Sequence, residues 1–82
     1  MTTKLKCEIK NGFTPNEKIA RIQGADGKFD EVIVSVQSIT GNRLMASEIG
    51  RDNQGKRVLI ELPRESTSGR WRMWVNAASV GG

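Results

Sequence analysis

Histidine is absent from this chain of 82 residues, and cysteine occurs once, as Cys7. Without histidine no side chain ordinarily titrates near neutral pH, and a lone cysteine forms neither an internal disulfide nor a zinc site. Cys7 lies on the apolar side of its segment, as a packing residue does, and has no histidine partner. We therefore expect no enzyme, no metal and no cofactor. An active site assembled between subunits stays open as the alternative.

Long apolar runs are also absent. No stretch approaches the roughly 20 apolar residues of a membrane helix, and no apolar run of a signal peptide follows Lys4 and Lys6. Apolar residues make up 37% of the chain and aromatic residues 5%, so a single domain over residues 1–82 should have a thin core. We expect a cytoplasmic protein with disordered ends at 1–3 and 81–82, and with self-association as a further source of stability.

Apolar and polar residues alternate with a period of two along most of the chain, whereas helical periodicity is nearly absent. Turn residues separate the alternating segments, and Asp26-Gly27 is a strong hairpin signal. Pro63 ends the fifth segment because it cannot donate a ladder hydrogen bond. The pattern predicts an all-β fold with strands over residues 4–10, 17–23, 29–36, 43–49, 56–62 and 70–75.

Segments 56–62 and 70–75 are predicted to form a central hairpin. Each carries three alternate apolar residues, and a one-residue slip would bury arginines, so the register is strongly specified. We expect Trp71 to lie in the core, and Trp74, three residues further on, to point to the outer face. The predicted pairs are Val58–Val75, Ile60–Met73 and Leu62–Trp71 on the inner face, and Leu59–Trp74 and Glu61–Arg72 on the outer face.

The two halves of the chain resemble each other at an offset of 41 residues. Residues 34–39 (VSVQSI) align with residues 75–80 (VNAASV), and each group follows a predicted hairpin. Two interpretations fit this similarity: a duplicated three-stranded unit with a pseudo-twofold axis, or coincidence between two β-rich segments.

The outer face of the predicted hairpin surrounds an indole with arginines. Thirteen Lys and Arg against nine Asp and Glu give a net charge of +4, which suits a polyanionic partner. Guanidinium groups contact phosphates, and an indole stacks on a base. A face of lysines on the first strand would extend this surface. The candidate binding residues are Arg57, Arg70, Arg72, Trp74, Lys4, Lys6 and Lys10.

Two structural interpretations compete with this one. Arg72 and Glu61 form an ordinary cross-strand pair in the predicted register. Leu59 and Trp74 are equally suited to a second small core under a loop or to an interface between subunits. We therefore predict a non-enzymatic binding module that contacts nucleic acid or another polyanion. The alternative is a protein-interaction or self-assembly module that uses Leu59 and Trp74, or an open strand edge, to form a homodimer or bind a protein partner.

The segment 66–69 (STSG) lies between Arg64 and Arg70. Its hydroxyl and backbone N–H groups could cradle a phosphate. It lacks the glycine spacing and the lysine of a P-loop, and a plain hairpin turn explains it as well.

Short strands of similar length, polar turns and a Trp-containing strand that runs into residues 75–80 (VNAASV) resemble the SH3-like small β-barrels. In SH3 domains a strand leads through a short 3₁₀ turn into a closing Tyr-Val, and Ser79-Val80 stands in that place here. The resemblance implies a small antiparallel barrel of five or six strands. It concerns the fold alone.

Overall fold

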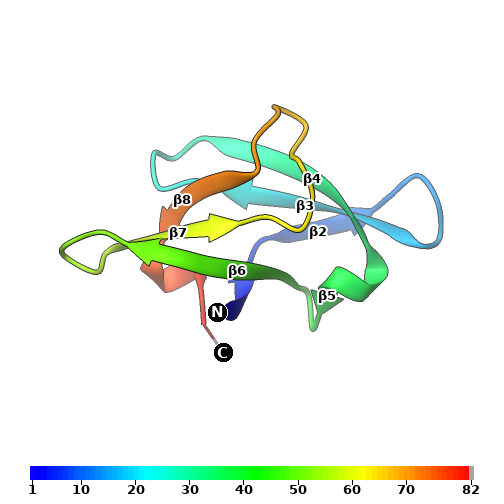
Figure 1. Cartoon of the computed structure of the whole chain (residues 1–82). Coiled ribbons are helices and arrows are strands. Elements are labelled where there is room, and N and C mark those ends of the chain that lie inside the picture. The colour runs from blue at the N-terminus through cyan, green and yellow to red at the C-terminus, as the bar shows by residue number, and fades with distance from the viewer. Residues whose placement is uncertain (82) are drawn as a thin grey trace.

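The computed structural model of the protein describes residues 1–81 and places most of them in two antiparallel β-sheets (Figure 1). The first sheet has the order β1-β6-β7-β8, with β5 also paired to β6, and the second has the order β2-β3-β4. The elements are β1 (Thr2–Lys6), β2 (Glu8–Asn11), β3 (Glu17–Gln23), β4 (Phe29–Ser35), the 3₁₀ helix η1 (Val36–Ser38), β5 (Ile39–Thr40), β6 (Arg43–Arg51), β7 (Arg57–Glu61), β8 (Arg72–Asn76) and the 3₁₀ helix η2 (Ala77–Ser79).

The predicted all-β, antiparallel class is confirmed, but a closed barrel is not found. In the part of the chain that the structure describes, no ladder joins β4 to β8, and the strands remain in two sheets. These residues form eight strands instead of five or six. The difference arises because the first predicted strand is divided, and because the two-residue strand β5 forms a tight hairpin with β6.

The first predicted strand, 4–10, is divided at Cys7 because its two parts belong to different sheets. The part before Cys7 forms β1 and pairs with β6, and the part after it forms β2 and pairs with β3. Leu5 is fully buried, whereas Cys7 and Ile9 pack against the core from its margin. One continuous segment thus links the two sheets.

The hydrophobic core lies between the inner faces of the two sheets. Alternation along each strand sends every second side chain inward, as the period-two pattern requires. The second sheet contributes four aliphatic side chains and the first sheet most of the rest. The buried apolar residues are Leu5, Ala20, Ile22, Val32, Val34, Leu44, Ala46, Val58, Ile60, Leu62, Met73 and Val75.

The predicted register of the β7–β8 hairpin is confirmed for the pairs Val58–Val75 and Ile60–Met73, as well as for the two outer pairs. The prediction that Trp71 lies in the core is wrong, since its side chain is 55% exposed. Its carbonyl still accepts a hydrogen bond from the Leu62 amide at 2.8 Å. Strand β8 begins only at Arg72, however, so Trp71 lies past the end of the ladder.

The inner face of β4 also departs from the expected pattern. The predicted strand 29–36 includes Val36, which alternation places on the same face as Val32 and Val34, but Val36 is exposed. Strand β4 ends at Ser35, whose hydroxyl accepts a hydrogen bond from the Gln37 amide and begins η1. The 3₁₀ turn rotates Val36 away from the core.

The first and last described residues, Met1 and Gly81, both contact the sheet of β1 and β6, whose strands Figure 1 shows. Residues 1–3 were expected to be disordered, but Thr2 and Thr3 belong to β1 and pair with Ser47 and Ala46. The amide of Gly81 donates to the Lys4 carbonyl at 3.1 Å. The same expectation for residue 82 falls outside the described residues.

Residues 41 positions apart occupy related places in the fold. Lys4 of β1 lies directly opposite Met45 of β6 in the antiparallel ladder. The helices η1 and η2, of three residues each, follow β4 and β8. After them Ile39 pairs with Leu44, and Val80 bridges to Leu5.

Candidate functional site

An open pocket of about 440 Å³ lies on the outer face of β7 and β8. The register places Leu59 opposite Trp74, and Glu61 opposite Arg72, on this face. The loop before β8 adds Arg70, and the turn between β3 and β4 adds two small residues. The pocket is lined by Ala25, Asp26, Arg57, Leu59, Arg70, Arg72, Met73 and Trp74. The structure therefore gathers four of the seven predicted binding residues, the three arginines and the indole, around one hollow.

Trp74 forms an open wall of this pocket, because 41% of its surface is exposed in the single chain. The guanidinium carbon of Arg57 lies 5.8 Å from the centre of the indole ring, within the range of a cation–π interaction. The Trp74 carbonyl accepts a hydrogen bond from the Ala25 amide at 2.9 Å, which holds the β3–β4 turn against the edge of β8. The backbone of Trp74 is thus held by the β3–β4 turn, while its indole ring contacts Arg57 and stays partly exposed.

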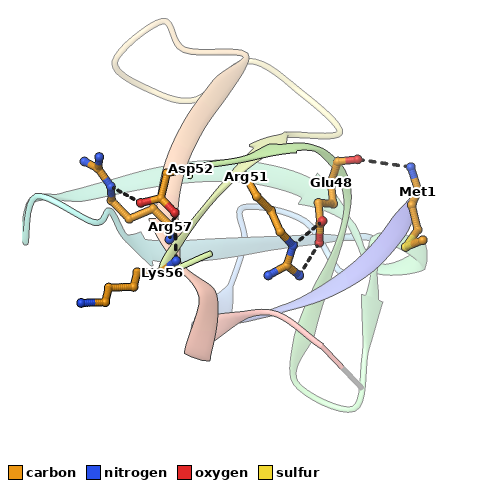
Figure 2. Close-up of polar contacts among 6 residues, drawn as sticks. All are labelled: Met1, Glu48, Arg51, Asp52, Lys56 and Arg57. Atoms are coloured by element: carbon orange, nitrogen blue, oxygen red, sulfur yellow. Dashed lines mark hydrogen bonds and ion pairs between the residues drawn. The ribbon is translucent and has the colours of Figure 1, made fainter. Parts of the chain in front are cut away.

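Arg57 is held by Asp52, at the start of the β6–β7 turn (Figure 2). One carboxylate oxygen, Oδ1, accepts from the Lys56 and Arg57 amides at 2.9 and 3.2 Å, and Oδ2 accepts from Arg57 Nε at 3.2 Å. Partial burial acts to raise the pKa of Asp52, but these hydrogen bonds and the arginine charge outweigh it and lower the pKa. Asp52 was not among the predicted residues, although its place in a polar turn before a basic strand was a usable signal.

The other two arginines differ in their partners. Arg72 Nε lies 3.3 Å from a carboxylate oxygen of Glu61, as the predicted cross-strand pair requires. The guanidinium of Arg70 takes part in no ion pair with any of residues 1–81. Arg70 is therefore the arginine of this pocket that is available to a ligand without breaking an existing pair.

The three predicted lysines do not extend this surface. Lys4 and Lys6 lie on β1, which β6 and β7 separate from β8. Lys10 lies on β2 in the other sheet, where its ammonium is 3.5 Å from Glu8 and 3.7 Å from Glu31. The face of lysines expected on the first strand is divided between the two sheets, because β1 pairs with β6 and β2 pairs with β3.

The segment 66–69 does not present a free cradle of hydroxyls. Ser66 Oγ and Ser68 Oγ donate to Oδ2 of Asp30 at 2.7 and 2.6 Å. The amide of Thr67 also donates to the carbonyl of Glu31 at 2.8 Å, so the β7–β8 loop is fastened to the start of β4. These hydroxyls are already occupied by a carboxylate, and the segment is a structural turn.

Asp30 is a buried carboxylate that the sequence patterns did not reveal. It is 8% exposed and shares the inner face of β4 with Val32 and Val34. Burial acts to raise its pKa, but hydrogen bonds from Ser68, Ser66 and the Glu31 amide, with the positive charge of Arg70, lower the pKa below its ordinary value. Its position in an otherwise apolar inner face was the available signal.

A second hollow, of about 510 Å³, lies beside the exposed ring of Trp71. Its lining comes from β1, β6 and the end of β7, and is more apolar than charged. The lining residues are Thr2, Met45, Ala46, Ser47, Glu61, Leu62, Pro63 and Trp71.

Reactive groups are few in the structure. Burial raises the pKa of the Cys7 thiol, and a backbone hydrogen bond with Leu44 opposes this only in part. A raised pKa leaves little thiolate near neutral pH. Residues 1–81 contain no cluster of three or more Cys, Asp or Glu side chains arranged to hold a metal ion, and they form no helix long and apolar enough to cross a membrane.

Comparison of the chain with protein-family profiles, curated proteins and solved structures found no match in any of the three. The residues that line the pocket are therefore the guide to the kind of ligand that it suits. Three guanidinium groups, two of them paired with carboxylates, line the hollow beside a half-exposed indole.

Proposed function

We propose that the protein binds single-stranded nucleic acid, without catalysis, in the pocket between β7, β8 and the β3–β4 turn. The observation that carries this proposal is that Arg57, Arg70 and Arg72 line one hollow with an indole that is 41% exposed. Phosphates suit the guanidinium groups, and an unpaired base suits the indole face. A paired base in a duplex would not reach the ring, so a single strand is the expected form.

A salt titration tests the proposal. Each phosphate contact on a single strand changes the slope of log affinity against log salt by about −0.7, so the slope is roughly −0.7 if Arg70 alone contacts a phosphate and roughly −2 if all three arginines leave their partners to do so. We expect a fluorescently labelled oligonucleotide of roughly 12 nucleotides to bind at low salt and to dissociate as salt rises. Trp74→Ala should remove about 1–3 kcal/mol of binding free energy, the usual value of one stacked base.

Lys18→Ala is the matched control, because it removes one positive charge from the other sheet, where the Lys18 ammonium bonds to Asn11. The affinity of the Lys18→Ala variant for the oligonucleotide should stay close to that of the natural protein. Absence of binding at low salt, or binding that is unchanged in Trp74→Ala and Arg72→Ala, would contradict the proposal.

The second candidate function is self-assembly or binding of a protein partner. Two exposed tryptophans favour it: Trp74 beside Leu59, and Trp71 beside the hollow near Pro63. Such rings at a protein surface are often buried in an interface. Sedimentation velocity separates the candidates, since a stable dimer with shielded tryptophan fluorescence supports assembly, and a monomer with quenchable fluorescence supports an open binding face.

The repeat at an offset of 41 residues supports a further proposal about origin, that the chain is a duplicated unit. The ladder of β1 with β6 pairs Thr2 with Ser47 and Lys6 with Arg43 on the two sides of the Lys4–Met45 pair. An axis between Lys4 and Met45 would exchange these outer pairs. The SH3-like relationship also stays a proposal, and it is supported by η2 leading into the bridge of Val80 with Leu5.

A further inference from the structure

Arg70 stands on a loop rather than on a strand, and its place in the pocket therefore depends on what holds the loop. The segment leaves β7 after Glu61 and joins β8 at Arg72. Figure 1 shows the loop, in yellow and orange, rising towards β4. If this loop were mobile, the backbone of Arg70 would have no fixed position, and its long side chain would not be held at the pocket. The contacts that hold the loop therefore decide where Arg70 lies.

Ser66 connects Arg70 to the core. Its hydroxyl donates to Asp30 Oδ2 at 2.7 Å and accepts from the Arg70 amide at 3.0 Å. The Ser66 amide donates in turn to the Arg70 carbonyl at 2.8 Å. Ser66 and Asp30 are 6% and 8% exposed, so this chain of hydrogen bonds is shielded from water.

Ser68 is the matched control for Ser66, because both hydroxyls bind the Asp30 carboxylate. Its hydroxyl donates to the same Asp30 oxygen at 2.6 Å. No hydrogen bond joins Ser68 to Arg70 among residues 1–81. Removing either hydroxyl deprives Asp30 of one donor, but only removal of the Ser66 hydroxyl deprives Arg70 of its acceptor.

We propose that Asp30 and Ser66 are positioning residues of the nucleic-acid pocket, which fix Arg70 through the chain Asp30–Ser66–Arg70. The inference rests on the proposed function. It assigns the buried carboxylate a role in ligand binding besides its role in folding. Asp30 and Ser66 act through Arg70 and do not touch the ligand themselves.

The test measures the affinity and salt slope for a single-stranded oligonucleotide of roughly 12 nucleotides in Ser66→Ala, Ser68→Ala and Arg70→Ala, and in the double variant of Ser66 and Arg70. Loss of one phosphate contact lowers the magnitude of the salt slope by about 0.7. Arg70→Ala and Ser66→Ala should both show this change, whereas Ser68→Ala should keep the slope of the natural protein. The double variant should bind as weakly as Arg70→Ala alone.

Several outcomes would overturn the inference while leaving the proposed function intact. One is an equal effect of Ser66→Ala and Ser68→Ala on affinity and slope. Another is an effect of Ser66→Ala that persists in full when Arg70 is already alanine. If the natural protein binds no oligonucleotide at low salt, the proposed function fails and the inference fails with it. Should Ser66→Ala not fold, Ser66→Cys keeps the shape of the side chain with a weaker acceptor, and the same slope change is expected.

Discussion

Asp30 is a carboxylate that the fold buries and then surrounds with hydrogen-bond donors. The hydroxyls of Ser66 and Ser68 and the amide of Glu31 lie 2.6–2.8 Å from its oxygens. A buried charge without such donors would be strongly destabilising, whereas a charged acceptor with several donors stabilises the folded state. Asp30 thus holds the β7–β8 loop against β4, together with the hydrogen bond from the Thr67 amide to the Glu31 carbonyl.

The low pKa of Asp30 predicts a loss of stability in acid. Hydrogen bonds, together with the charge of Arg70, hold the pKa in the folded state below the ordinary value despite burial. The stabilisation is therefore complete above the unfolded pKa of roughly 3.9 and disappears as the pH falls through the lower folded value. Asp30→Asn should lower the free energy of unfolding by about 1–3 kcal/mol at pH 7, and this difference should shrink towards acid.

Urea denaturation at a series of pH values, followed by tryptophan fluorescence, measures the difference between Asp30→Asn and the natural protein. The other carboxylates are common to both proteins, so their contributions largely cancel. A difference in unfolding free energy that stays constant down to the most acidic pH would contradict the assignment.

Turns of one sheet cover the edge strands of the other. The amide of Ala25, in the β3–β4 turn, donates to Trp74 of β8, and the amide of Thr67, in the β7–β8 loop, donates to Glu31 of β4. Unpaired edge strands are sites of unwanted association. The two reciprocal contacts reduce the open edge, and they also bring residues of the β3–β4 turn to the pocket.

Two isoleucines on neighbouring strands, Ile60 of β7 and Ile49 of β6, allow a matched comparison. Ile60 is fully buried and pairs with Met73, so Ile60→Ala should cost about 2–5 kcal/mol of unfolding free energy. Ile49 lies at the bulge between Glu48 and Gly50 of β6 and is 42% exposed, so Ile49→Ala should change stability by about 0.5 kcal/mol or less. Chemical denaturation measures both, and equal losses would contradict the assigned inner face of β7.

At the scale of the whole molecule, the chain passes between its two sheets twice, at Cys7 and through η1, and its first and last described residues both contact the sheet of β1 and β6. The Met1 ammonium donates to the Glu48 carbonyl at 3.2 Å, a contact that Figure 2 draws. Gly81 and Lys4 are hydrogen-bonded at the other end of the chain. The ends thus contribute to the sheet of β1 and β6.

The contact of Gly81 with Lys4 of β1 predicts that a circular permutant folds. A short glycine linker from residue 82 to residue 1, with new ends between Gly41 and Asn42, should keep cooperative unfolding and the native fluorescence. This turn is exposed and joins β5 to β6, so cutting it removes little packing. A permutant opened between Leu59 and Ile60, inside β7, is the control and should not fold. Equal failure of both permutants would contradict the prediction.

The strands were predictable because alternation is a local property. Residues 17–23 form β3 as expected, and the β7–β8 register followed from the need to bury Val58 and Val75 together. The pocket residues on β7 and β8 were predictable for the same reason, since the outer face follows once the inner face is known. Arg57 and Trp74 therefore lie where the alternation placed them.

The remaining features depended on contacts between segments distant in sequence. Asp30 is buried because Ser66 and Ser68 come from 36 and 38 residues away to bind it. Trp71 is exposed because the loop anchored at Asp30 continues up to it, and β8 begins only at Arg72, two residues later than predicted. Lys10 is separated from the pocket because β2 joins the other sheet.

The sequence by itself determined the all-β class, most of the strands and the two faces of the central hairpin, since period-two alternation and turn residues act locally. Only the tertiary structure decided that the strands form two sheets rather than a closed barrel, that Asp30 is buried and that Trp71 is not. It also decided that Arg70 meets Arg57 and Trp74 at one pocket. These outcomes depend on the pairing of strand edges and on the contacts between each loop and the opposite sheet. Both involve residues far apart in the sequence, so a local sequence pattern does not predict them.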